Sequence, residues 1–266
     1  MTRPFATGSN SSRRASTRCW PPRASSFEFD EAGWIETLSS ALKVDELLRK
    51  HIAVMDKYDP ENKVALYLDE WGTWYAGLEG VNPGFLHQQN TLRDALVASI
   101  HFDVMSRYAE RVKMANIAQM VNVLQAMILT KDEQMVLTPT YHVFEMYKPW
   151  QDATHLPFEL ETPQYRHGET SVPAVHGSAV RAKDGNVYVA RSNLDPDTPA
   201  SISASVSGLQ AGSVSGRVLT ADAITAHNTF EQPAQVRPTA FDGASLSGDT
   251  LKVELPAKSV VVLQLR

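Results

Sequence analysis

The chain has 266 residues, of which 43% are hydrophobic and 21% charged, and its one cysteine is Cys19. These proportions are ordinary for a globular protein and exclude collagen-like, disordered acidic and membrane-spanning classes. A lone cysteine excludes an internal disulfide and a thiolate zinc cage. There is no run of about 20 apolar residues, so no membrane partner is expected.

The net charge of -5 is unevenly distributed. Residues 1–27 hold five arginines and no acidic residue, whereas the remainder holds 20 basic and 30 acidic residues. A mildly acidic body without clustered Lys and Arg argues against a nucleic-acid partner. Because residues 1–27 lack helical periodicity and the apolar centre of a signal peptide, we expect a disordered or aberrant N-terminal arm and a cytoplasmic location.

Residues 28–150 predict alternating helices and strands. Asp30 is a candidate N-cap for a helix whose apolar residues recur at helical spacing over 34–55. A short apolar run at 64–68 predicts a buried strand, and residues 88–108 predict a second helix. A further strand is expected at 111–115, followed by a helix at 117–129. This alternation is typical of an α/β unit.

The pattern changes beyond residue 150, where short β-rich runs alternate with turn dipeptides such as Asp184-Gly185 and Gly248-Asp249. The clearest runs are 187–190, 202–206, 217–219, 251–255 and 260–265. Such a pattern predicts an antiparallel β-sandwich or jelly roll over 151–266. The expected fold class is therefore α/β plus all-β, with a domain boundary near residue 150.

One segment places a carboxylate at the end of a predicted strand: Leu68-Asp69-Glu70-Trp71-Gly72. In parallel α/β sheets, ligand chemistry gathers at the carboxyl ends of strands. Trp71, Trp74 and Tyr75 follow, and flat aromatic faces suit the apolar face of a sugar ring. Spacing alone leaves two interpretations of Glu70 open, a catalytic carboxylate or a loop ion-pair partner.

Metal and cofactor signals are weak elsewhere in the chain. The eight histidines are scattered without paired metal spacing, and no glycine-rich phosphate loop is present. Glu145 lies in a predicted apolar-aromatic helix and is interpreted as structural. We therefore expect neither a metal nor a cofactor.

Several segments resemble the α-L-arabinofuranosidases of glycoside hydrolase family 51. VALYLDEWGTWYAG, at residues 64–77, resembles the nucleophile segment of that family, and residues 88–130 resemble the segment after it. Residues 135–148, 222–236 and 255–265 resemble the end of its barrel and its C-terminal β domain. The resemblance runs in order from about Phe27 to Arg266.

The resemblance implies a retaining glycosidase built on a (β/α)8 barrel followed by a β-sandwich. It would hydrolyse terminal α-L-arabinofuranosyl groups of arabinan or arabinoxylan with two carboxylates and no cofactor. Glu70 matches the nucleophile of the family. Gln119 matches a glutamine that hydrogen-bonds the arabinose, and Trp74 matches a position that lines its pocket.

The sequence departs from that family at several site residues: the His and Tyr that the family brings from its sixth strand have no matching motif upstream of Glu70. The acid/base glutamate of the family follows an asparagine, but no Asn-Glu dipeptide occurs in this sequence. A (β/α)8 barrel takes about 250 residues, whereas the α/β pattern here covers 28–150. We therefore expect a truncated or frame-shifted chain that holds the last part of a barrel.

Two alternatives stay open. The chain could be a non-catalytic carbohydrate-binding or subunit-interaction fragment, or another chain could supply the rest of the barrel. A homo-oligomer is expected only if the full-length barrel is restored.

Overall fold

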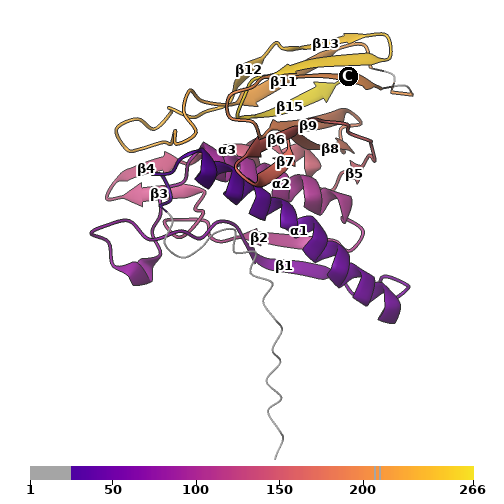
Figure 1. Ribbon diagram of the computed structural model, residues 1–266. Coiled ribbons are helices and arrows are strands. Elements are labelled where there is room, and N and C mark those ends of the chain that lie inside the picture. Colours follow the sequence, from indigo (N-terminus) through magenta and orange to yellow (C-terminus); the bar gives the residue numbers. More distant parts are fainter. Residues whose placement is uncertain (1–24, 207, 210) are drawn as a thin grey trace, which may run out of the picture.

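The computed structural model describes residues 25–206, 208–209 and 211–266. Its helices are α1 (Glu31–Tyr58), α2 (Leu92–Arg107) and α3 (Pro139–Met146), with short 3-10 turns η1 (Pro83–Phe85) and η2 (Lys148–Trp150). The strands before residue 150 are β1 (Leu66–Trp71), β2 (Val112–Ile117), β3 (Ile128–Lys131) and β4 (Gln134–Leu137). Figure 1 shows α1 and α2 lying between the β1–β2 pair and the sheets of the C-terminal half.

The strands after residue 150 form three antiparallel sheets. A six-stranded sheet has the order β12-β11-β15-β9-β8-β5, a three-stranded sheet has the order β10-β14-β13, and β6 pairs with β7. Their bounds are β5 (Thr154–His155), β6 (Gln164–His167), β7 (Thr170–Pro173), β8 (Val175–Arg181), β9 (Val187–Asn193), β10 (Ala200–Ser205), β11 (Val214–Leu219), β12 (Thr239–Phe241), β13 (Ala244–Ser247), β14 (Thr250–Leu255) and β15 (Ser259–Leu265). All five β-rich runs predicted from the sequence are strands.

The first helix follows its sequence signals closely. The carboxylate of Asp30 accepts a hydrogen bond from the backbone N–H of Gly33 at 3.0 Å, which satisfies a free donor at the helix N-terminus. The apolar residues at helical spacing, among them Trp34, Leu38 and Leu48, are buried against the neighbouring elements. The predicted helix over 34–55 is therefore confirmed.

The second helix is buried around most of its circumference. It begins with a capping box, in which the Thr91 side chain accepts from the first turn and Asp94 accepts from the backbone N–H of Thr91 at 2.7 Å. The helix contacts α1, α3 and the strands β8, β9 and β15. A helix enclosed in this way is apolar on several faces rather than along one stripe.

Strands β1 and β2 are parallel neighbours. The buried strand expected at 64–68 instead begins at Leu66, and alternate residues of β1 are exposed. Leu66 lies opposite Val112, and Trp71 opposite Ile117. The remaining edge of each strand is unpaired within the described residues. Tyr67 and Met114 are 56% and 42% exposed, so this short sheet leaves apolar side chains uncovered.

The helix predicted at 117–129 is wrong. Strand β2 runs to Ile117, and the chain then forms a loop that leads into the β3–β4 hairpin. Asn122 and Leu124 adopt φ values of 59° and 52°, which a right-handed helix does not allow. The Asn122 side chain holds this loop by accepting from the Thr130 N–H at 2.7 Å and donating to the Thr130 hydroxyl at 2.8 Å. The apolar spacing reflects a small separate core around Leu129 instead.

One hydrophobic core joins the helices to the six-stranded sheet. Trp34 and Leu96 pack in the same cluster as Leu194, Leu219 and Val260. The indole Nε1 of Trp34 also donates to the carbonyl of Leu194 at 2.9 Å. The two predicted domains thus pack on each other through buried apolar side chains.

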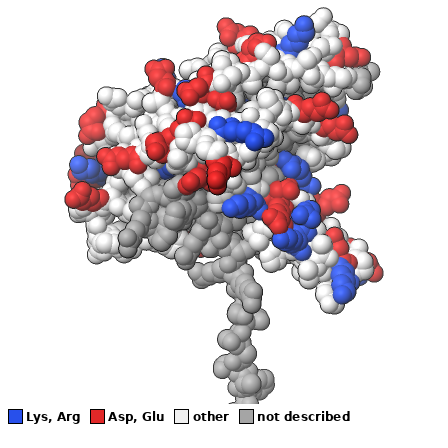
Figure 2. All heavy atoms as spheres, in the orientation of Figure 1, with Lys and Arg blue, Asp and Glu red and all other residues white. Residues whose placement is uncertain are grey.

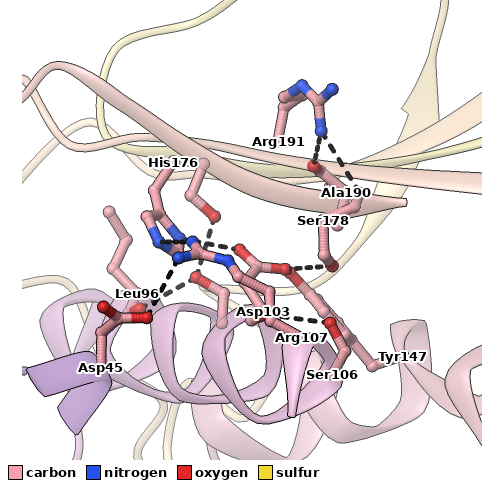
Figure 3. A network of polar contacts seen from close by, with 12 residues as sticks. Asp45, Leu96, Asp103, Ser106, Arg107, Tyr147, His176, Ser178, Ala190 and Arg191 are labelled. Carbon is pink, nitrogen blue, oxygen red and sulfur yellow. Dashed lines mark hydrogen bonds and ion pairs between the residues drawn. The ribbon is translucent and has the colours of Figure 1, made fainter. Parts of the chain in front are cut away.

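A buried polar network lies at the same junction (Figure 3). The carboxylate of Asp103, on α2, accepts hydrogen bonds from Tyr147 at 2.9 Å and Ser178 at 2.5 Å, and it contacts His176 Nδ1 at 3.1 Å. Arg107 lies 2.8 Å from the other ring nitrogen of His176. Such a satisfied network fixes the helix on the sheet, because moving either would leave a buried carboxylate unpaired.

The predicted arm falls largely on residues 1–24, which lie outside the described residues. Ser25 and Ser26 contact α2: the Arg93 guanidinium donates to their carbonyls at 3.3 and 3.1 Å. The expected disorder is therefore wrong for this end of the predicted arm. Figure 2 shows acidic and basic side chains interspersed over one face of the molecule. None of the described helices is long and apolar enough to cross a membrane.

Candidate active site

The carboxyl ends of the two parallel strands bring the predicted site residues to one edge of the molecule. Glu70 lies near the end of β1 with its side chain half-buried. Gln119 lies two residues beyond β2, where its side chain is exposed. The Ala118 N–H donates to the Trp71 carbonyl at 2.9 Å, so the pairing of the two segments continues past β2.

The residue after Glu70 anchors the strand end in the core. Trp71 is 2% exposed and packs edge-on against His101 and Phe102, with ring centroids 5.2 and 5.6 Å apart. Its ring also stacks with Phe144 at 5.9 Å. The pairing of β1 with β2 shifts register between Leu68 and Trp71, and at this irregular strand end Trp71 is buried while Glu70 stays half-buried.

Burial also changes the titration of the histidine under that strand. His101 is 1% exposed, and desolvation lowers its pKa to about 4. The ring is therefore neutral at pH 7. It packs against Trp71 as an apolar group and puts no positive charge beneath the strand that carries Glu70.

The loop after Gly72 is held from both sides of Trp74. The Thr73 hydroxyl donates to the carboxylate of Asp94 at 2.6 Å. The Tyr75 N–H donates to the side chain of Gln88 at 2.9 Å. Asp94 and Gln88 are fully buried, whereas the Trp74 ring between these two anchors is half-buried. The backbone is thus fixed while part of the ring faces outward.

The buried carboxylate in this network has a raised pKa. Desolvation raises the pKa of Asp94, while Arg93 and hydrogen bonds from Thr73 and Thr91 act in the opposite direction. Arg93 is itself buried and lies over the rings of Phe29 and Tyr75, 3.5 and 4.4 Å from their centroids. These contacts join the loop after β1, the start of α2 and the segment before α1.

The loop after β2 is built mainly from backbone bonds. The Gln119 N–H donates to the Val123 carbonyl at 3.0 Å, and the Ala118–Gln119 peptide bond is cis. The His87 ring contacts the Asn122 carbonyl at 3.0 Å. These bonds leave the amide side chain of Gln119 facing outward beside the end of β1.

A separate groove of about 580 Å³ lies along β2, between the end of α2 and α3. Its walls include Phe102, Tyr141, Phe144, Val112 and Met114. Glu70, Trp74 and Gln119 are not among the described residues that line it. The predicted site residues thus lie on an open edge rather than in this groove.

Glu145 has the structural role expected for it. It lies near the end of α3, and both of its carboxylate oxygens accept from Arg217 Nη1 at 2.7 Å. This ion pair joins α3 to β11. Among the described residues, no three His, Cys, Asp or Glu side chains gather as a metal site would require.

Sequence reasoning missed three side chains that shape this edge: Gln88, Asp94 and Gln125. The spacing of Thr91 and Asp94 is a capping signal that could have placed the start of α2. Nothing near Gln125 in the sequence indicates its long-range contacts.

Comparison with known proteins identifies the class. The sequence profile of the alpha-L-arabinofuranosidase C-terminal domain matches residues 69–259. The chain is 48% identical, over 246 residues, to an intracellular exo-alpha-L-arabinofuranosidase of Bacteroides ovatus, covering 92% of this chain and 48% of that protein. The chain thus spans about half the length of the curated relatives it matches.

Solved structures agree. The GH51 arabinofuranosidase from Xanthomonas axonopodis pv. citri superposes with a TM-score of 0.93 at 65% identity, covering 94% of this chain and 51% of that one. An arabinofuranosidase of Thermotoga maritima shares the fold, with a TM-score of 0.74 at 24% identity over 89% of this chain and 50% of that one. The chain belongs to the α-L-arabinofuranosidases of glycoside hydrolase family 51 and corresponds to their C-terminal part.

Proposed function

We propose that this chain carries the nucleophile side of a retaining α-L-arabinofuranosidase site, with Glu70 as nucleophile. The observation that carries the proposal is the position of Glu70 at the carboxyl end of a parallel strand, beside the loop that presents Gln119. Gln119 hydrogen-bonds the arabinose, and Trp74 lines its pocket. The names of the relatives support the choice of substrate.

The reaction needs two carboxyl groups. The Glu70 carboxylate attacks the anomeric carbon and the bond to the leaving oxygen breaks, while a second, protonated carboxyl group gives its proton to that oxygen. Water activated by the same second group then hydrolyses the glycosyl ester. The family places its acid/base after an asparagine, and no Asn-Glu dipeptide occurs in these 266 residues, so none of them is assigned this second role.

The natural substrates are terminal α-L-arabinofuranosyl groups of arabinan or arabinoxylan, and no cofactor takes part. The proposed location is cytoplasmic, which the word intracellular in the name of the Bacteroides ovatus relative supports. Residues 28–150 are proposed to be the last part of a (β/α)8 barrel, and residues 151–266 a jelly-roll-like sandwich.

A substrate with a good leaving group needs little help from an acid when its glycosidic bond breaks, so it tests the role of Glu70 without a second carboxyl group. The purified chain is incubated with dinitrophenyl α-L-arabinofuranoside, and the intact protein and its peptides are analysed by mass spectrometry. We expect a pentosyl adduct on Glu70 with little turnover. Glu70→Gln should abolish the adduct, and the matched control Asp69→Asn, an exposed neighbouring carboxylate, should keep it. An adduct that persists in Glu70→Gln would contradict the assignment.

A non-catalytic role in subunit interaction is the second candidate. It is favoured by the free edge of β2 and by the apolar groove beside it. The mass-spectrometric assay for the adduct on Glu70 distinguishes the two candidate functions. A chain that forms no adduct, yet binds the remaining half of the Xanthomonas enzyme produced as a separate polypeptide, would support the interaction role.

A further inference from the structure

One buried residue, Gln125, contacts the segments that follow both strands, through its side chain in one case and its backbone in the other. Its Oε1 accepts from the Thr73 N–H at 2.9 Å, and its own backbone N–H donates to the Ala118 carbonyl at 2.9 Å. Thr73 follows Glu70 by three residues, and Ala118 immediately precedes Gln119. A single residue thus bonds to the chain beside each of the two proposed site residues.

We propose that Gln125 is a positioning residue, which fixes the strand end carrying Glu70 against the loop carrying Gln119. The effect of Gln125 on the reaction rests on the proposed function of Glu70 as nucleophile. The coupling of the two segments can be tested without any activity.

The amide of Gln125 is held in one orientation. Gln125 is 0% exposed, and its Nε2 donates to the Asp94 carbonyl at 2.7 Å and to the Thr140 hydroxyl at 3.2 Å. If the amide were reversed, its NH2 group would face the Thr73 N–H, and two donors would oppose each other. A glutamate could not donate to the Asp94 carbonyl. The site therefore requires an amide.

The two anchors of that amide belong to helices. Asp94 lies in the first turn of α2, and Thr140 in the first turn of α3. Groups that orient reacting residues hold their geometry best when they are themselves fixed to regular elements. Gln125 thus joins the Thr73 backbone to the starts of two helices, in addition to the bond between the Thr73 hydroxyl and Asp94.

Gly72 is an independent feature of the same contact. Its φ is +133°, a conformation that side chains with a Cβ rarely adopt. A Cβ at this position would lie 3.1 Å from Gln125 Oε1 and 3.3 Å from Gln125 Cβ. The glycine therefore lets the end of β1 approach Gln125 closely enough for the Thr73 hydrogen bond.

The first test compares Gln125→Met with a matched control. Met keeps the length of the side chain but removes its donors and acceptor. Asn228 is also 0% exposed, and its side chain makes three hydrogen bonds, to the backbones of Leu137 and Val236. Asn228→Leu therefore removes a comparable set of buried hydrogen bonds away from the proposed site. Hydrogen exchange is measured for the segments 70–76 and 117–121. Gly72→Ala serves as a second variant, which disturbs the contact without removing the amide.

We expect the segment 70–76, whose Thr73 N–H loses or weakens its bond to Gln125 Oε1, to exchange at least about 10-fold faster in Gln125→Met and Gly72→Ala, under conditions where the whole protein remains folded. The segment 117–121 keeps its bond to the backbone N–H of residue 125 and should be affected less. Asn228→Leu should leave both segments unchanged at a similar loss of thermal stability. Unchanged exchange in Gln125→Met, or an equal acceleration in Asn228→Leu, would overturn the proposal.

The second test measures the single-turnover rate of adduct formation on Glu70 with dinitrophenyl α-L-arabinofuranoside. Misplacement of a reacting group by about 1 Å costs up to about 100-fold in rate. We expect the limiting rate constant to fall at least about 10-fold in Gln125→Met, with the half-saturating concentration changed less than about 2-fold. A limiting rate within 2-fold of wild type would contradict the positioning role. If the wild-type chain forms no adduct, the proposed function fails, and hydrogen exchange still decides the proposal.

Discussion

The parallel β1–β2 pair and the six-stranded antiparallel sheet are covered to very different extents by the same chain. The central strands β9 and β15 of the large sheet are almost wholly buried, with the helices on one face and the three-stranded sheet on the other. The β1–β2 pair packs on the helices through Leu66 and Leu68, but leaves Tyr67 and Met114 exposed. Parallel sheets are normally covered on both faces.

Within the described residues, the six-stranded sheet is covered on both faces, whereas the parallel pair is covered on one face only. A strand of the large sheet has its neighbours and covering layers within the described residues. The parallel pair has covering on one face and unpaired backbone groups at both outer edges. We therefore expect perturbations of the large sheet to cost the most stability, and perturbations of the parallel pair to change association instead.

The largest effect is expected from Leu263→Ala in β15. Leu263 is 0% exposed in a strand paired on both sides, so truncation leaves a cavity and should cost about 3–5 kcal/mol of unfolding free energy. Chemical denaturation of wild type and Leu263→Ala measures this loss of unfolding free energy. Tyr67→Ala, at an exposed position on β1, should cost less than about 1 kcal/mol. Equal losses in the two variants would contradict the comparison.

Lowering the pH should reduce the unfolding free energy through His101, which packs against Trp71 at the end of β1. The folded-state pKa of His101 is about 4 against an ordinary value of 6.5, so the unfolded chain binds the proton first as the pH falls. This contribution to stability is full above pH 6.5 and is lost progressively toward pH 4, by about 3 kcal/mol in total. The measurement is unfolding free energy against pH for wild type and His101→Phe. The difference in unfolding free energy between wild type and His101→Phe should vary with pH over this window. A constant difference would refute the lowered pKa of His101.

Trp34→Phe tests the junction between the helices and the sandwich. It removes the hydrogen bond from Nε1 to the Leu194 carbonyl and leaves a buried acceptor unsatisfied, which should cost about 1–3 kcal/mol. Calorimetry with hydrogen exchange distinguishes a general loss from separation of the two layers. Exchange that rises in α1 while β9 stays protected would show that the junction opens before the sheet does.

The smallest effect on stability is expected from Met114→Lys. Met114 is 42% exposed on β2 and lines the apolar groove, so its replacement should change unfolding free energy by about 0.5 kcal/mol or less. The same change should reduce concentration-dependent self-association, as measured by light scattering. Met135→Lys, at an exposed position in the β3–β4 hairpin, is the matched control and should have a weaker effect.

Local patterns predicted the elements that rest on local physics. The helical spacing after Asp30 and the apolar runs of β2 and β15 formed as expected, whereas the buried strand expected at 64–68 begins at Leu66 and is only partly buried. The helix expected at 117–129 failed because left-handed residues at Asn122 and Leu124 and a side-chain bond to Thr130 override apolar spacing. The pairing of β1 with β2 and the contacts of Gln125 join residues far apart in sequence, and no local pattern encodes them.

For Glu70, the sequence pattern predicted the strand end, and its assignment as nucleophile came from resemblance to a family. Its surroundings depend on side chains that approach from other elements, such as Asp94 and Gln125. Spacing within a single segment could not have revealed these contacts.

Strand β15 has a consequence for how the protein tolerates shortening. Residues 259–265 pair with both β9 and β11 near the middle of the six-stranded sheet. A premature stop codon just before residue 259 would remove only the last eight residues, yet it would divide the sheet into β12-β11 and β9-β8-β5. The damage from a nonsense mutation would therefore depend on the place of the lost strand in the sheet rather than on the length of chain lost.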